Sequence, residues 1–102
     1  MPKLVRDNIP EIIRQNDGIE TIFRIASSDL EFREVLDAKL DEEISELRSA
    51  PDKLSIAEEI ADVIEVLLAL AAQDGYTPAQ IEEIRQKKRA KRGGFEKRII
   101  LE

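Results

Sequence analysis

The chain has 102 residues, 37% of them charged, and a formal net charge of −6. It contains no Cys and no His, which excludes disulfides, thiol nucleophiles, zinc sites built on these residues and catalysis by a histidine base. The negative charge argues against general affinity for nucleic acid or for an anionic membrane. We expect one domain, residues 1–102, with a modest core, whose chemistry must use carboxylates, Lys, Arg, hydroxyls or a hard metal ion.

The sequence shows neither an N-terminal apolar targeting segment nor an apolar run approaching the roughly 18 residues of a membrane span. We therefore expect a soluble, cytoplasmic protein without a membrane partner. The basic residues are unevenly distributed, because residues 85–98 contain eight Lys or Arg and a single Glu. This basic tail follows a strongly acidic remainder of the chain.

The first predicted element is a short helix. Asn8 and Pro10 are typical of a helix cap and first turn, and Gly18 is typical of the end of a helix. Residues 20–26, ETIFRIA, have β-branched and aromatic content and predict a short strand or extended segment. The closing residues 95–101, FEKRIIL, are a potential pairing partner for that strand.

Two long helices are predicted next. Ser28 and Glu31 form a capping-box pattern that opens a helix to about Ser49. After a break at Pro51, a second long helix is predicted over about residues 54–73. Since the connection is short, the two helices should be antiparallel neighbours.

A fourth helix is predicted from a second capping-box pattern, with Thr77 as the cap, Pro78 in the first turn and Gln80 closing the box. It should end before Gly93. The predicted fold is therefore mostly α, an antiparallel helical bundle with a short β pairing of the two ends as an option. Because residues 63–72 are apolar nearly all round, we expect the bundle to be completed by homo-oligomerisation, as a dimer or a larger assembly.

Acidic residues interrupt the apolar faces of both long helices. On a wheel of about 100° per residue, Glu43 falls inside the apolar stripe of the first helix and Glu46 lies about 60° from it. In the second helix, Asp62 falls beside Val66 and Glu59 lies about 60° away. Each helix thus presents two carboxylates at i, i+3 spacing, toward or beside the surface on which it packs.

Four carboxylates gathered at a helix interface would be costly without a cation. Oxygen ligands alone select Mg²⁺ or Mn²⁺, with Ca²⁺ a poorer fit, over zinc or copper. Such an ion points to phosphate chemistry, since it polarises phosphoryl oxygens and activates water. The alternative is that both acidic pairs lie on solvated helix faces, which is common in charged helices.

The same residues carry a resemblance. EEISEL, residues 42–47, and EEIADV, residues 58–63, resemble the E-x-x-E and E-x-x-D motifs of the all-α nucleoside triphosphate pyrophosphohydrolases, which include MazG-like proteins, dimeric dUTPases and phosphoribosyl-ATP pyrophosphohydrolase. KLVRDNIPEII near the N-terminus and RGGFEKRIIL near the C-terminus are similar to the phosphoribosyl-ATP pyrophosphohydrolase-like branch. The likeness covers nearly the whole chain.

The resemblance implies Mg²⁺-dependent cleavage of a nucleoside triphosphate, or a phosphoribosyl-ATP-like nucleotide, to the monophosphate and pyrophosphate, with house-cleaning of non-canonical nucleotides as one possible role. It places Glu43, Glu46, Glu59 and Asp62 as metal ligands and catalytic residues. Glu42 is a further residue that could orient groups in the site or act as the base, and the same is true of Glu58.

Basic residues at the two ends of the chain are candidates for binding substrate phosphates. Lys3 and Arg6 lie near the N-terminus, and Lys88 and Arg92 share one face of the last helix. The alternative for the last helix is a solvated basic end that complements the helix dipole. Three other functions stay open: a non-catalytic nucleotide or metal binder, a nucleic-acid module using the basic tail, and a purely structural helical interaction module.

Overall fold

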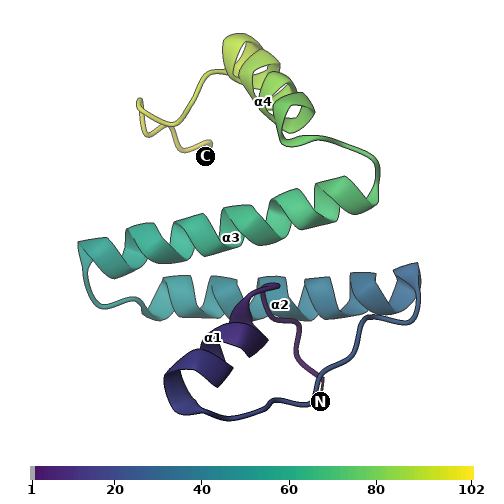
Figure 1. Cartoon of the computed structure of the whole chain (residues 1–102). Helices are drawn as coiled ribbons and strands as arrows, with labels where there is room; N and C mark the ends of the chain where they lie inside the picture. The colour runs from purple at the N-terminus through teal and green to yellow at the C-terminus, as the bar shows by residue number, and fades with distance from the viewer. Residues whose placement is uncertain (1) are drawn as a thin grey trace.

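Across the described part of the chain the fold consists of four helices connected by loops (Figure 1). In this computed structural model, which describes residues 2–102, α1 spans Ile9–Asp17, α2 Asp29–Ser49, α3 Lys53–Gln73 and α4 Pro78–Arg92, and no strand forms within that range. The helix positions and the all-α fold class predicted from the sequence are confirmed. The central unit is the antiparallel pair α2–α3, which lie side by side along most of their lengths.

Capping residues explain where the long helices begin. Ser28 Oγ accepts a hydrogen bond from the backbone N–H of Glu31 at 3.0 Å, as the capping-box pattern predicts. The Glu31 carboxylate turns back to the N–H of Ser27 at 2.8 Å, one residue earlier than in the standard box. Asp52 caps α3 by accepting from the N–H of Ser55 at 2.7 Å.

The fourth helix carries the complete capping box. Thr77 Oγ1 accepts from the N–H of Gln80, and the Gln80 side chain accepts from the N–H of Thr77. The helix ends at Arg92, directly before Gly93, whose φ of 85° is a conformation that glycine adopts without a Cβ penalty. Figure 1 shows α4 beyond α3, on the side away from α1.

The predicted β pairing of the two chain ends is wrong. Residues 20–26 form an unpaired connection between α1 and α2, with Ile22 103% exposed and Ile25 82% exposed. The closing segment after α4 forms no strand and is held by an ion pair between Arg89 and Glu96. The two segments lie on opposite sides of the α2–α3 pair, so their backbones cannot exchange ladder hydrogen bonds (Figure 1).

The core of a single chain is small. Among the described residues only Leu36 and Val66, one from each helix of the central pair, are buried hydrophobic side chains. The surface area is 8912 Å², whereas a folded monomer of this mass exposes about 5,800 Å². The radius of gyration is 17.1 Å, against about 13 Å for a compact domain of this length. None of the helices in residues 2–102 is long and apolar enough to cross a membrane.

Candidate functional site

Three of the predicted carboxylates meet between α2 and α3. Oxygen atoms of Glu43, Glu59 and Asp62 all lie within 4.8 Å of one another. The i, i+3 spacing puts Glu59 and Asp62 on the same face of α3, and this face turns toward Glu43 on α2. The helical wheel prediction that these residues share one interface is therefore confirmed in its geometry.

A second acidic group lies on α2 itself. Oxygen atoms of Glu42, Glu43 and Glu46 also lie within 4.8 Å of one another. Glu43 belongs to both groups, so it links them into one cluster of five carboxylates, which we call the carboxylate cluster: Glu42, Glu43, Glu46, Glu59 and Asp62. All four residues predicted as metal ligands are members.

The carboxylate cluster differs from ordinary acidic surface groups because some of its oxygen atoms are buried. Glu43 is only 6% exposed, and its Oε2 atom has no hydrogen-bond partner. The Oε2 atom of Glu59 is likewise buried without a partner. An unpaired buried carboxylate oxygen loses its hydration without compensation, a cost that proteins rarely leave in place unless the atom has a ligand or a functional role.

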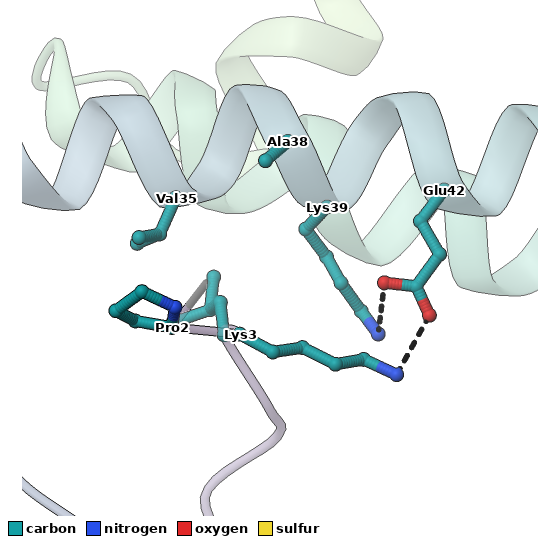
Figure 2. A pocket seen from close by; sticks show the side chains of 7 residues that line it. Pro2, Lys3, Val35, Ala38, Lys39 and Glu42 are labelled. Carbon is teal, nitrogen blue, oxygen red and sulfur yellow. Dashed lines mark ion pairs between the residues drawn. The ribbon is translucent and has the colours of Figure 1, made fainter.

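Three basic side chains partly neutralise the cluster. Lys39, 17% exposed at its side chain, lies 3.1 Å from Glu43 and 3.7 Å from Glu42. Lys3 from the N-terminal segment pairs with the other oxygen of Glu42 at 2.8 Å, so that the two ammonium groups approach one carboxylate from neighbouring directions (Figure 2). Arg6 donates to Asp62 at 2.6 Å.

The surroundings shift the protonation of several members. Burial, the close approach of the Glu43 carboxylate and the charges of neighbouring acids raise the pKa of Glu59 to about 7. The charge of Glu43, followed by burial, raises the pKa of Glu46. By contrast, the hydrogen bond from Lys3 lowers the pKa of Glu42, and the same contact raises the pKa of Lys3.

The donor set fits a hard divalent cation. Its five carboxylates are matched by the three basic residues Lys3, Arg6 and Lys39, which leaves an excess of two negative charges at full ionisation. The ligand atoms are all oxygens, and two of them are buried without a partner. Oxygen-only sites of this kind suit Mg²⁺ and Mn²⁺ rather than soft metals.

The predicted basic residues divide into two groups. Lys3 and Arg6 contact the carboxylate cluster, through Glu42 and Asp62. Lys88 and Arg92 are exposed on α4 and form no ion pair with the cluster within residues 2–102. A single chain therefore brings together only the N-terminal pair.

Lys39 is a site residue that the sequence reasoning missed. Its spacing from Glu43 is i, i+4, the arrangement in which opposite charges meet on a helix surface. That spacing was a usable signal, although the same pattern occurs on many solvated helices. The burial of both side chains, which separates this pair from an ordinary surface pair, depends on tertiary packing.

A family model of known proteins matches most of the chain. The family model described as phosphoribosyl-ATP pyrophosphohydrolase matches residues 14–89, which contain both acidic motifs. The chain belongs to the phosphoribosyl-ATP pyrophosphohydrolase family. This family's general activity is pyrophosphohydrolysis of a nucleotide, and the resemblance seen in the two motifs is confirmed.

Among curated proteins, an uncharacterized protein of Mycolicibacterium smegmatis (strain ATCC 700084 / mc(2)155) is 54% identical over 50 residues. The aligned part is 49% of this chain and 49% of that relative, so the match spans about half the length of each. No solved structure matches the chain.

Proposed function

We propose that the chain hydrolyses a nucleoside triphosphate, or a phosphoribosyl-ATP-like nucleotide, to the monophosphate and pyrophosphate in a reaction that requires Mg²⁺, with Mn²⁺ as a substitute. House-cleaning of non-canonical nucleotides is the role that we favour. One observation carries the proposal: Glu43 is buried between two helices among four other carboxylates and keeps an unpartnered oxygen. Membership of a pyrophosphohydrolase family supports the same reaction.

In this proposal Glu43, Glu46, Glu59 and Asp62 hold the divalent ion. When bound, the ion supplies polarisation of phosphate oxygens and a lowered pKa for water. Glu43 and Asp62 come from different helices, so the α2–α3 packing fixes their separation before any ligand arrives. Such preorganisation reduces the reorganisation needed during the reaction.

Basic side chains around the cluster would orient the phosphate chain. Arg6 and Lys3 lie at the edge of the cluster, and their side chains are 56% and 60% exposed, which leaves them free to turn toward an arriving phosphate. Arg6 can bind two phosphate oxygens with its planar fork. We retain Lys88 and Arg92 as phosphate-binding candidates that would act from a second copy of the chain.

The chain has no His, so a carboxylate is the side chain best suited to accept the proton of the attacking water. Glu42 is poorly suited, since Lys3 and Lys39 occupy both its oxygens and keep its pKa low. A group whose pKa lies near the working pH is the better acceptor. The pKa of Glu46 is raised rather than lowered, so this exposed carboxylate takes up a proton more readily than Glu42, and it has one oxygen to ligate the ion and a second to accept the proton.

Association of copies of the chain is part of the proposal. Four large apolar side chains lie along one face of α3, at spacings of three and four residues, and are 39–50% exposed: Ile56, Ile60, Ile64 and Leu67. Contiguous apolar surface of this kind marks an interface. The surface area in excess of that of a compact monomer supports the same conclusion. We propose a homodimer or a larger homo-oligomer built on α3.

The test is pyrophosphate release from a panel of canonical and modified nucleoside triphosphates, with and without Mg²⁺. Glu59→Ala and Asp62→Ala should each lower kcat by about 100-fold or more, since each removes a ligand of the ion on which catalysis depends. The matched control is Glu34→Ala, an exposed acid on α2 outside the carboxylate cluster.

Two results would overturn this proposal. Activity that survives both substitutions would remove the cluster from the reaction. Tight nucleotide binding with no product over hours would instead identify a non-catalytic binder.

A further inference from the structure

A pocket opens beside the carboxylate cluster, between the N-terminal segment and the central helix pair. Its volume is about 590 Å³, within the roughly 300–1,000 Å³ usual for small-molecule sites. One wall comes from residues 4–12, including the start of α1, and the opposite wall from α2 and α3. Glu43 and Asp62 lie in its lining, so the pocket is continuous with the cluster.

The lining changes from charged to apolar along the helices. Lys39 and Glu43 border one end, whereas Phe32 lies at the other, 11 residues away from Glu43 on α2. That separation corresponds to about 16 Å along a helix at about 1.5 Å per residue. On the antiparallel α3 the same direction leads from the acidic residues Asp62 and Glu65 to the apolar Val66 and Ala69. The α2 wall and the α3 wall of the pocket are therefore charged at the same end and apolar at the same end.

A nucleotide has the same division into a charged part and a largely apolar part. If the phosphates of the nucleotide lie at the carboxylate cluster, its nucleoside must occupy space beside the cluster. The pocket offers an apolar surface in that space, with the ring of Phe32 in its wall. Aromatic and apolar walls with few polar groups are the usual surroundings of a bound base.

Asn8 supplies a polar group in this pocket. It occupies the cap position of α1, yet its side chain forms no capping hydrogen bond within the described chain. The backbone N–H of Ile12 instead bonds to the backbone carbonyl of Asn8 at 2.9 Å. The side-chain amide is therefore available, and it can both donate and accept. These are the two properties needed to distinguish the hydrogen-bonding edges of bases.

We infer that this pocket binds the nucleoside part of the substrate, and that Asn8 is the residue that discriminates between bases. The inference rests on the proposed function for the position of the phosphates. It adds the direction in which the substrate lies, from the carboxylate cluster toward Phe32 and Ala69.

The test uses two pocket variants and two matched controls. Ala69→Leu fills the apolar end, and Ala72→Leu makes the same change at an exposed position of α3 outside the pocket lining. Asn8→Ala removes the amide, and Asn16→Ala does so at an exposed position of α1 outside that lining. Steady-state kinetics on a nucleotide panel are compared with inhibition by inorganic tripolyphosphate, which has the phosphate chain and no nucleoside.

Ala69→Leu should raise KM for nucleotides about tenfold. Asn8→Ala should lower kcat/KM for the preferred nucleotide about tenfold, and should thereby reduce the differences in kcat/KM between nucleotides that carry different bases. Inhibition by tripolyphosphate should stay within about twofold of wild type, because the phosphate contacts are untouched, and both controls should behave as wild type. Mg²⁺ affinity measured by calorimetry shows that each variant is folded. If Ala69→Leu fails to fold, the inference is tested by Asn8→Ala alone, because Asn8 is exposed and its replacement does not disturb the core.

The inference is overturned if both pocket variants match wild type on every nucleotide, or if tripolyphosphate inhibition weakens in parallel with nucleotide use. Failure of the proposed function is distinguishable from this result. A wild-type chain that releases no pyrophosphate can still be titrated with the fluorescent methylanthraniloyl derivative of ATP in Mg²⁺. Weaker binding by Ala69→Leu but not by Ala72→Leu would then support the pocket, and no binding by wild type would overturn both.

Discussion

The guanidinium of Arg6 lies 2.6 Å from Oδ1 of Asp62, although 56 residues separate the two in the chain. Lys3 makes an equivalent contact with Glu42 at 2.8 Å. The N-terminal segment thus places two cations on the acidic residues where a divalent ion would bind. Since one carboxylate oxygen cannot serve both a close guanidinium and a metal ion equally well, Arg6 and the metal should compete for Asp62.

Replacing Arg6 by Ala should therefore have opposite effects on two ligands. Without nucleotide, Mg²⁺ should bind about two- to fivefold more tightly, which corresponds to the modest strength of an exposed ion pair. With Mg²⁺ present, the nucleotide should bind more weakly because a phosphate contact is lost. Isothermal titration of each ligand measures both effects. Arg85→Ala, which removes a pairing partner of Glu82 on α4, is the control and should change neither affinity.

Glu43→Gln should stabilise the metal-free protein and weaken its response to Mg²⁺. In the metal-free protein it removes a buried charge that lies among four like charges, while Lys39, the ion-pair partner of Glu43, keeps Glu42 as a second partner. The relief of repulsion should outweigh the lost ion pair, so the free energy of unfolding should rise. The same variant should lose the increase in Tm that Mg²⁺ gives the wild type. Thermal unfolding with and without Mg²⁺ measures both changes, and a destabilised metal-free variant would contradict our account of the cluster.

The raised pKa of Glu59 predicts proton release when the metal binds. The folded protein holds a proton on this carboxyl up to about pH 7, whereas the unfolded chain loses it near pH 4.5. The metal-free protein should hence lose stability as pH rises from about 4.5 to about 7. Mg²⁺ must displace the proton, so its affinity should increase with pH, by up to about tenfold per unit below pH 7.

Calorimetry in two buffers with different ionisation enthalpies counts the protons released. We expect a fractional proton at pH 7 that falls toward zero by pH 9. A Mg²⁺ affinity that is constant between pH 6 and pH 8 would contradict this assignment of the proton to Glu59.

The exposed face of α3 predicts association through that helix. Ile64→Asp places a charge in the middle of this face and should shift the protein toward monomer in sedimentation velocity experiments. Ile22→Asp, in the unpaired connection between α1 and α2, is the matched control and should sediment as wild type. A wild-type chain that is monomeric at all concentrations would contradict the proposed assembly.

Local signals in the sequence were sufficient to predict where the helices lie. Cap residues such as Ser28 and Thr77 act within three residues of themselves, so their effect can be read without knowing the fold. The wheel position of Glu43 also predicted a side chain on the packing face, and this residue is 6% exposed. Periodicity and capping depend on neighbours along the chain, which is why both predictions were confirmed.

Features that depend on distant contacts were not predictable in the same way. The β-rich composition of residues 20–26 indicated a strand, but a strand needs a partner, and the fold places the other candidate segment on the far side of the helix pair. The contact of Arg6 with Asp62 and the pocket beside it depend on how the N-terminal segment folds over α2 and α3. No spacing in the sequence encodes that path.

The most direct measurement of the central claim is ³¹P NMR of the products formed from a nucleoside triphosphate. Our account predicts the monophosphate and pyrophosphate in equal amounts, formed only when Mg²⁺ or Mn²⁺ is present and lost in Asp62→Ala. Formation of the diphosphate and orthophosphate, or turnover that continues in the presence of a chelator, would contradict it.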